Sequence, residues 1–363
     1  MTPLVVVLFI IGIVLLIWGA DLLVRGASNI AAAFGVPPLV IGLTVVALGT
    51  SSPELAVSIQ AVLAGQPDLT LGNVVGSNIA NVLLILGIAA LVAPLVVAPQ
   101  LLRREVPVMI GVSLLVWWLA SDGLLGQIEG AILVTLLLVF LGGSVWLTRR
   151  EMADAAVAQP LPLASAHRKP RALLRNLGLA VLGLIMLIIG AQWLVDSAVA
   201  VARALGVSEL LIGLTIVAVG TSLPEIATSV LAGLRGEREI AIGNVVGSNI
   251  LNLLAVLGLT ALLAPAALVV PPATLAFDLP VMVAAAIVCL PIFFNGLLIS
   301  RWEGALFLSY YVAYTTYLIL HATRSEALDE FSFTMLFVII PLTVLALAIG
   351  TFRGIQERRA AGS

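Results

Sequence analysis

Residues 35–64 read GVPPLVIGLTVVALGTSSPELAVSIQAVLA, and residues 206–235 read GVSELLIGLTIVAVGTSLPEIATSVLAGLR. Both stretches are apolar enough for membrane helices, yet each contains a glycine, several hydroxyl residues, a proline and a glutamate, Glu54 or Glu225. An acid at the centre of a bilayer costs a few kcal/mol unless it faces a polar interior. Each stretch therefore predicts a broken helix whose polar side faces protein rather than lipid.

The two stretches belong to an internal repeat with an offset of 171 residues. Residues 35–94 align with 206–265 without gaps, and 35 of the 60 positions are identical. Weaker similarity continues beyond them, for example between EVPVMI (105–110) and DLPVMV (278–283). The chain is therefore predicted to consist of two related halves.

The composition is typical of a polytopic membrane protein. Hydrophobic residues make up 61% of the chain and charged residues only 10%, whereas soluble domains have about 25% charged residues. A membrane-crossing helix needs about 20 mostly apolar residues. Eleven such segments lie near 3–24, 36–64, 70–94, 105–121, 124–147, 173–198, 207–234, 239–264, 278–294, 302–321 and 331–352. We expect an all-α polytopic membrane protein.

The spans divide into two groups of five and one extra helix. Residues 1–147 form the first five-helix repeat, 148–172 a polar linker, 173–321 the second repeat, and 331–352 an additional span. Because five is odd, the second repeat is predicted to cross the membrane in the opposite direction. Inverted repeats are typical of secondary transporters, whose binding site lies near the midplane at the repeat interface.

The positive charges predict the orientation. With the N-terminus outside and the C-terminus cytoplasmic, 15 of the 17 Lys and Arg residues fall on the cytoplasmic side. The linker 148–172 is then cytoplasmic, and the expected location is the plasma membrane of a prokaryote. The net charge of -2 and the single cysteine favour neither nucleic-acid binding nor a disulfide.

The broken helices supply oxygen atoms. Pro53 and Pro224 lack an N–H group, so the carbonyls of Gly49 and Gly220 are expected to lose their helical partners. The helix that follows each break carries an Asn–Ser–Asn stripe at every fourth position, and its GxxxG spacing is expected to allow close helix packing. These stripes are Asn73, Ser77 and Asn81, and Asn244, Ser248 and Asn252; the glycines are Gly72, Gly76, Gly243 and Gly247. Asn78 and Asn249 are expected either to bridge helices or to support the site.

Carboxylate, hydroxyl and carbonyl oxygens are the ligands that Na⁺ and Ca²⁺ prefer. Two ionised glutamates would be neutralised by one Ca²⁺ or by two Na⁺, so a site that holds either set predicts exchange by alternating access. A proton-coupled Ca²⁺ antiporter, with Glu54 and Glu225 as proton carriers, remains an alternative. So does transport of Mg²⁺ or Mn²⁺. An enzyme is not expected, because no nucleophile–base pair or catalytic metal motif appears in the apolar segments.

At these residues the sequence resembles the sodium/calcium exchangers of the calcium/cation antiporter superfamily. The resemblance covers both five-span halves and rests on two alpha-repeat signatures, 35–94 and 206–265. They include GLTVVALGTSSPELAVS with GNVVGSNIAN, and GLTIVAVGTSLPEIATS with GNVVGSNILN. The chain is most similar to prokaryotic exchangers, because its linker is too short for a regulatory calcium-binding domain.

The resemblance implies a cation site without a resident cofactor, in which Ca²⁺ and Na⁺ are the transported substrates. The implied ligands are Glu54, Glu225, Thr50, Ser51, Thr221, Ser222, Ser77, Ser248, Asn81 and Asn252, with the carbonyls of Ala47 and Ala218. The first and sixth spans would be the sliding pair of the family's alternating-access model. Some relatives carry an acid where this chain has Asn252, so the resemblance implies a potassium-independent exchanger. The family core has ten spans, which leaves 331–352 without an assigned role.

Overall fold

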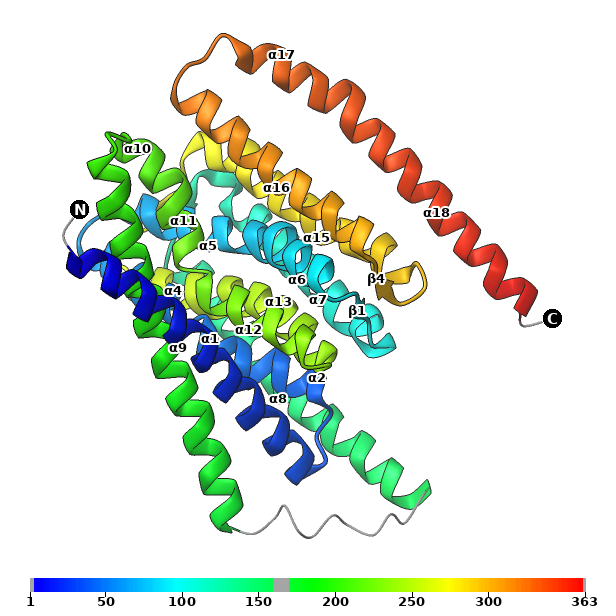
Figure 1. Ribbon diagram of the computed structural model, residues 1–363. Coiled ribbons are helices and arrows are strands. Elements are labelled where there is room, and N and C mark those ends of the chain that lie inside the picture. Colours follow the sequence, from blue (N-terminus) through cyan, green and yellow to red (C-terminus); the bar gives the residue numbers. More distant parts are fainter. Residues whose placement is uncertain (1–2, 159–169, 362–363) are drawn as a thin grey trace.

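The computed structural model describes residues 3–158 and 170–361 and is almost entirely helical (Figure 1). The η segments are π-helical turns, except η4, which is a 3₁₀ turn. The first half contains α1 (Pro3–Phe34), α2 (Pro38–Ile41), η1 (Gly42–Val46), α3 (Ala47–Thr50), α4 (Ser52–Leu63), α5 (Pro67–Ala80), η2 (Asn81–Ile85), α6 (Leu86–Val92), β1 (Leu95–Val96), η3 (Leu101–Glu105), α7 (Val106–Leu119), η4 (Ala120–Asp122), β2 (Leu124–Leu125) and α8 (Gln127–Ala158).

The second half repeats this order of elements except for the 3₁₀ turn η4. It contains α9 (Pro170–Ala204), α10 (Glu209–Ile212), η5 (Gly213–Val217), α11 (Ala218–Gly220), α12 (Leu223–Leu234), α13 (Arg238–Leu251), η6 (Asn252–Leu257), α14 (Gly258–Leu263), β3 (Leu268–Val269), η7 (Thr274–Asp278), α15 (Leu279–Phe294), β4 (Leu298–Ile299) and α16 (Arg301–Ala322). The chain continues through α17 (Ala327–Thr334), η8 (Met335–Ile339) and α18 (Ile340–Ala361).

Most of the membrane spans predicted from the sequence are present in the structure. Among the described residues, eight helices are long and apolar enough to cross a membrane, and nine if the helix bent by 41° between Pro38–Thr50 and Ser52–Leu63 is counted. Two of the eleven predicted segments are outside this count. The segment 207–234 is divided among α10, η5, α11 and α12, and 302–321 lies in α16, whose four tyrosines and three threonine or serine residues lower its hydropathy.

The predicted linker 148–172 is helical at both of its ends. Helix α8 continues to Ala158 and α9 already begins at Pro170. Residues 151–158, EMADAAVA, are mostly good helix formers, so the helix extends beyond its apolar span. The rest of the predicted linker lies outside the described residues.

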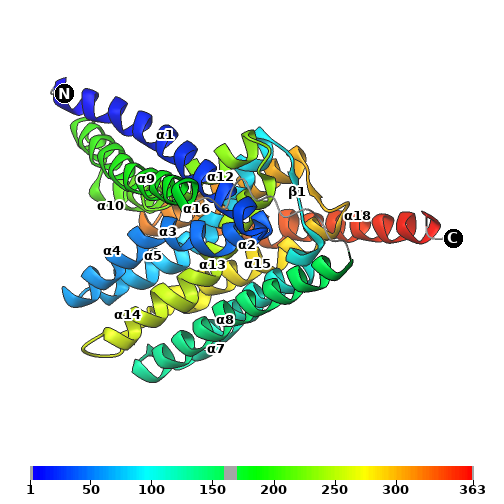
Figure 2. The same ribbon diagram turned by 90° about the horizontal axis from the view of Figure 1, so that it is seen from below.

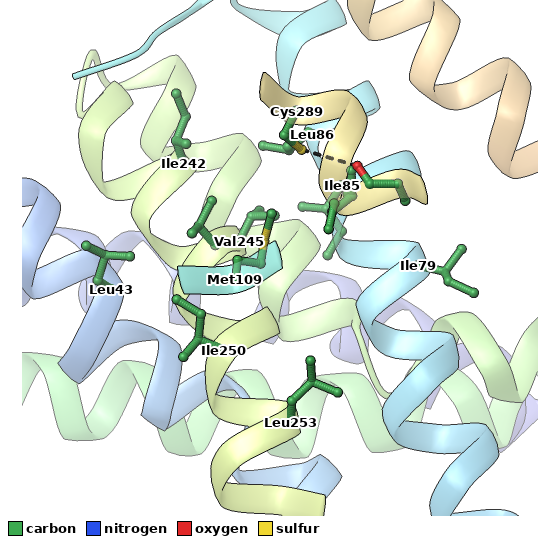
Figure 3. Close-up of a cluster of buried hydrophobic side chains, with 14 of the residues drawn as sticks. Leu43, Ile79, Ile85, Leu86, Met109, Ile242, Val245, Ile250, Leu253 and Cys289 are labelled. Atoms are coloured by element: carbon green, nitrogen blue, oxygen red, sulfur yellow. Dashed lines mark hydrogen bonds between the residues drawn. The ribbon is translucent and has the colours of Figure 1, made fainter. Parts of the chain in front are cut away.

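The centre of the fold is built from the two helices that follow the breaks. The spans Leu69–Val92 and Arg238–Leu263 are 83% and 89% buried, far more than any other span in the described part of the chain. Figure 3 shows Leu86 of one span beside Cys289, and Val245 of the other beside Met109, where these spans meet neighbouring helices. Any polar group on these helices is therefore held away from lipid.

Two short sheets join loops of the two halves. β1 pairs with β4, and β2 pairs with β3, both antiparallel. In the order of elements β1 corresponds to β3 and β2 to β4, so each sheet is the counterpart of the other. Each pairing places a loop of the first half on the same side of the fold as a non-equivalent loop of the second half. Equivalent loops therefore lie on opposite sides, which supports an odd number of spans in each half.

Helices α1 and α9 form a pair that lies across the outside of this centre (Figures 1 and 2). They approach closely because glycines face each other. A Cβ on Gly19 would lie 2.7 Å from the carbonyl oxygen of Gly183, and one on Gly183 would lie 2.5 Å from that of Gly19. Only 22% of each apolar span is buried, so the pair has a limited contact with the rest of the protein.

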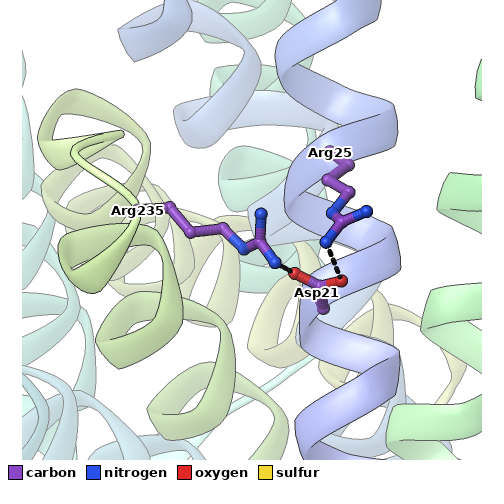
Figure 4. Close-up of polar contacts among 3 residues, drawn as sticks. All are labelled: Asp21, Arg25 and Arg235. Atoms are coloured by element: carbon purple, nitrogen blue, oxygen red, sulfur yellow. Dashed lines mark ion pairs between the residues drawn. The ribbon is translucent and has the colours of Figure 1, made fainter.

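A polar connection ties this pair to the loop between α12 and α13. Asp21 of α1 forms ion pairs with Arg25, one turn further along α1, and with Arg235 of the loop (Figure 4). Ser28 donates a hydrogen bond of 2.6 Å to the carboxylate of Glu237. At the repeat-related positions the chain has Gln192, Val199, Ala64 and Gln66, which carry no charge. These four residues therefore cannot form the same ionic connection at the repeat-related positions.

Candidate cation-binding site

The predicted site residues lie at the two helix breaks and on the two central helices. In the first half, Ala47 and Thr50 are in α3, Ser51 is at the break, Glu54 is in α4, Ser77 is in α5 and Asn81 begins η2. In the second half, Ala218 begins α11, Thr221 and Ser222 form the break, Glu225 is in α12, Ser248 is in α13 and Asn252 begins η6. π-Helical turns often occur at functional sites.

These residues come together inside the protein. Helix α4 packs against η6 and α12 packs against η2, so each break lies against the central helix of the other half. The side chains of Glu54 and Glu225 are each only 1% exposed. Except for Thr221, which is half-buried, the other predicted side-chain ligands are also buried.

Hydrogen bonds cross between the two halves at the site. The hydroxyl of Ser51 donates to the carboxylate of Glu225 over 3.3 Å, and that of Thr50 donates to Asn244 Oδ1 over 3.1 Å. The amide of Asn81 donates to Asn249 Oδ1 over 3.0 Å. The first motif thus reaches directly into the second, and both halves are needed to build one polar interior.

Many oxygen atoms of this interior have no hydrogen-bond partner within the described residues. They are Glu54 Oε2, Glu225 Oε2, Ser77 Oγ, Ser222 Oγ, Ser248 Oγ, Asn81 Oδ1 and Asn252 Oδ1. Leaving a buried polar group unsatisfied costs about 1–3 kcal/mol. Seven such oxygens from seven predicted ligands form a donor set that a bound cation would satisfy.

The charge of the site points to the same conclusion. Glu54 and Glu225 interact electrostatically across the interface between the halves. Two ionised carboxylates repel each other strongly where water is excluded, and a cation between them would relieve that repulsion. No group of three or more His, Cys, Asp or Glu side chains that could hold a metal ion occurs in the described part of the chain. A cation bound between the two glutamates would therefore need neutral oxygen atoms as its other ligands. Hard cations such as Na⁺ and Ca²⁺ prefer ligands of this kind.

Asn73 and Asn244, the first residues of the two Asn–Ser–Asn stripes, hold the broken helices in place. Asn73 donates to the backbone carbonyl of Glu54 over 3.1 Å and to Ser58 Oγ over 3.0 Å. Asn244 donates to Ser229 Oγ over 3.0 Å while it accepts from Thr50. Ser58 and Ser229 were missed as functional residues, although they recur at the repeat offset of 171 residues and could have been found from it.

Replacing Asn244 with Ala should therefore weaken the fold around the site. The substitution leaves the buried hydroxyls of Thr50 and Ser229 without this partner, at a cost of about 1–3 kcal/mol. We expect a clearly lower melting temperature of the purified protein. Asn78→Ala is the matched control, because Asn78 donates only to the carbonyl of Val74 in its own helix. Equal melting temperatures of the two variants would contradict this role for Asn244.

The proline breaks differ between the halves. The carbonyl of Gly49, which Pro53 deprives of its helical partner, accepts a 2.7 Å hydrogen bond from the hydroxyl of Ser52. The carbonyl of Gly49 thus has a partner even though Pro53 has no N–H to offer, because the hydroxyl of Ser52 donates instead. In the second half this position is Leu223, which has no hydroxyl to donate.

The GxxxG glycines allow close packing in the second half only. A Cβ on Gly247 would lie 2.5 Å from the carbonyl oxygen of Leu43, and one on Gly243 would lie 2.8 Å from that of Leu39. A Cβ on Gly72 or Gly76 would meet no atom within 4 Å. The packing prediction is therefore confirmed for α13, which lies directly on α2 and η1, and wrong for α5 in this conformation.

The two remaining asparagines also differ. Asn249 bridges helices, since it accepts from Asn81 and its amide lies 3.5 Å from the sulfur of Met109. Asn78 donates to the carbonyl of Val74 within its own helix. The bridging alternative thus holds for Asn249, while Asn78 satisfies its donor locally.

A family comparison agrees with this site. Residues 4–146 and 175–320 match the model of the sodium/calcium exchanger protein family. The chain belongs to the sodium/calcium exchanger family. Both matched segments contain one broken helix with its glutamate, so the family covers the whole of the site described above. Members of this family are transporters, and this multi-pass membrane protein is an antiporter of that family rather than an enzyme.

Similar proteins include named antiporters and exchangers from several organisms. The putative antiporter CaxA of Alkalimonas amylolytica is 41% identical over 84% of this chain and 95% of its own length. The sodium/calcium exchanger MaX1 of Methanosarcina acetivorans is 34% identical over 85% of this chain and 96% of its own length. The solved structure of the sodium-calcium exchanger NCX_Mj soaked with 2.5 mM Na⁺ and 0.1 mM Ca²⁺ superposes with a TM-score of 0.73. It is 32% identical and covers 86% of this chain and 97% of that one.

Proposed function

We propose that this exchanger moves Ca²⁺ in one direction and Na⁺ in the other through the site between Glu54 and Glu225. The observation that carries the proposal is the set of seven buried oxygens without hydrogen-bond partners in the described chain. All seven belong to residues for which the sequence predicts cation binding. Carboxylate, hydroxyl and amide oxygens are suitable ligands for both ions.

The charge at the site supports alternating occupancy. Glu54 and Glu225 together carry a charge of -2 when ionised, which one Ca²⁺ or two Na⁺ would neutralise. Both ions at once would leave an excess of positive charge in a buried site, which is costly. Ca²⁺ and Na⁺ therefore compete, and competition at one site is the condition for exchange.

The difference between the halves supports a carrier with two arrangements. Ser51 bonds to Glu225, whereas Ser222, at the equivalent position, has no partner among the described residues. Gly247 packs tightly where Gly76 does not. The two halves have near-identical sequences here but make different contacts. This difference is expected if the structure is one of two states, and if each half adopts the contacts of the other in the second state. Helices α1 and α9, with their limited contact to the centre, are our candidates for the sliding pair.

The neutral oxygens favour sodium over protons as the coupling ion. A proton carrier needs only the two acids, whereas Ser77, Ser222 and Ser248 add hydroxyl oxygens that a proton would not use. Asn252 adds an amide where some relatives have a third acid, which supports an exchanger that does not transport potassium. The names of the relatives include both a sodium/calcium exchanger and a putative antiporter. We also propose a plasma-membrane location with the N-terminus outside and the C-terminus cytoplasmic.

Calcium binding to the purified full-length protein tests competition at this site. Isothermal titration calorimetry should show Ca²⁺ binding that Na⁺ weakens steeply, with a Hill coefficient above 1, while K⁺ at the same ionic strength has little effect. Equal effects of Na⁺ and K⁺ would contradict sodium binding at the site. Displacement of Ca²⁺ by acid, with no effect of Na⁺, would instead support proton coupling.

Loss of the connection between Asp21 and Arg235 should change the balance between the two arrangements. Movement of α1 relative to the α12–α13 loop must break this ion pair. The two side chains are partly exposed, and ion pairs near the protein surface contribute about 0.2–1 kcal/mol, so Asp21→Asn should shift the conformational equilibrium by up to about fivefold. The shift can be measured from the accessibility of a single engineered cysteine on α1, in a background without the native Cys289.

Arg25→Gln is the control for this experiment, because Arg25 pairs with Asp21 within α1 and does not connect it to another element. Arg235→Gln should reproduce the effect of Asp21→Asn, and the double variant should add little to it. Additive effects of the two substitutions would show that the ion pair does not control the equilibrium.

A further inference from the structure

The C-terminal helix lies beyond the repeated elements and contacts the rest of the protein lightly. Only 6% of the span Ala327–Phe352 is buried, and Figure 1 shows α18 at the edge of the molecule, beside α15 and α16. One polar contact is a 2.7 Å hydrogen bond from Tyr310 of α16 to Thr343. The sequence alone predicts no role for this helix.

A groove of about 620 Å³ lies between α18, α15 and η3. Its walls are mainly apolar, with Leu102 from η3, Leu290 and Phe294 from α15, and Leu297 from the loop after α15. Thr351 of α18 also lines the groove. This volume lies within the range of about 300–1,000 Å³ that is usual for small-molecule sites.

One positively charged side chain, that of Arg103, lines this groove. Arg103 contributes to the lining and is exposed. Within the described part of the chain, its guanidinium forms no ion pair or hydrogen bond. Arg103 follows β1 in the sequence. Strand β1 pairs with β4, which ends two residues before Arg301, so both arginines lie at the same end of the fold. The groove thus opens at an end of the fold that is rich in arginine, which by the positive-inside rule faces the cytoplasm.

We infer that this groove binds an anionic phospholipid of the cytoplasmic leaflet. One acyl chain occupies the apolar groove beneath α18, and the headgroup phosphate pairs with Arg103. The surrounding bilayer supplies such a ligand at high concentration, and basic pockets between membrane helices at the cytoplasmic side are suited to anionic headgroups. The lipid would fill the space between α18 and the body of the exchanger and so explain how a helix with few protein contacts is held.

The test measures lipid binding rather than transport, so it is independent of the proposed exchange of ions. The full-length protein is delipidated in detergent and titrated with phosphatidylglycerol, with phosphatidylcholine as the neutral probe, and bound lipid is counted by native mass spectrometry. The wild type should prefer phosphatidylglycerol. Because one arginine near a membrane contributes about 1 kcal/mol to anionic lipid binding, Arg103→Gln should lower that affinity about fivefold.

Two further variants make the result specific. Thr351→Trp places a large side chain in the groove from α18, outside the repeated core, and should reduce binding of both lipids. Arg175→Gln removes an exposed arginine of α9 that does not line the groove, and should bind like the wild type.

Equal phosphatidylglycerol binding by the wild type, Arg103→Gln and Thr351→Trp would overturn the inference. So would an equal loss in Arg175→Gln, which would indicate nonspecific attraction. A dimer that is lost in Thr351→Trp, without bound lipid in the wild type, would show that a second copy of the chain occupies the groove instead.

Discussion

Replacing Glu54 with Gln is expected to abolish Ca²⁺ binding and exchange while leaving the protein folded. Glutamine keeps the size of the side chain but removes one of the two charges that face the cation. Loss of one partner of a buried charged pair costs about 3–5 kcal/mol, which corresponds to at least a 100-fold loss of affinity. Glu225→Gln should behave in the same way, because both acids are buried at the same interface. Calorimetry and vesicle uptake measure the two losses.

The control for both variants is Glu129→Gln. Glu129 is half-buried at the start of α8, where its carboxylate accepts from the backbone N–H of Gly126 over 2.8 Å. It should retain Ca²⁺ binding, since it lies outside the site. Ca²⁺ affinity within a fewfold of the wild type in Glu54→Gln or Glu225→Gln would contradict the shared carboxylate site.

Two equivalent glycines should respond in opposite ways to alanine. In Gly247→Ala the new Cβ would lie 2.5 Å from the carbonyl oxygen and 2.7 Å from the Cα of Leu43. Overpacking of this kind costs about 1–3 kcal/mol, so we expect a lower melting temperature or a different resting conformation. In Gly76→Ala the Cβ meets no atom within 4 Å. Alanine also favours the helix by about 1 kcal/mol over glycine, so the melting temperature should stay the same or rise.

Gly76→Ala should nevertheless slow transport. When the halves exchange their roles, Gly76 takes the tightly packed position that Gly247 has here, and the same 1–3 kcal/mol then opposes that arrangement. Exchange should fall by about fivefold or more, although the protein is as stable as the wild type. Wild-type transport by Gly76→Ala would contradict the exchange of roles between the two repeats.

The general architecture was predictable because it depends on local properties of the sequence. Apolar length identified most spans, and Pro53 with its polar neighbours correctly indicated a break, which the structure places at Ser51 with a bend of 41°. The repeat also identified both glutamates, because a buried acid that recurs in an equivalent position is rare in an apolar segment. The end of α8 was missed because helix propensity extends it beyond the apolar residues.

The contacts between the halves were not predictable in the same way. Thr50 bonds to Asn244, and Asp21 pairs with Arg235, through packing of segments that are about 200 residues apart. The difference between Gly76 and Gly247 has another cause. Their sequence contexts are nearly identical, so only the conformation of the whole chain can place one of them in a tight contact and the other in open space.

The most direct test of the account is Ca²⁺ uptake by proteoliposomes that are loaded with Na⁺ and diluted into sodium-free buffer. We predict Ca²⁺ accumulation that requires the outward Na⁺ gradient and stops when a sodium ionophore dissipates it. Vesicles loaded with K⁺ should accumulate little Ca²⁺. Equal uptake in K⁺-loaded vesicles, or uptake that follows an imposed proton gradient without Na⁺, would contradict sodium/calcium exchange at the site between Glu54 and Glu225.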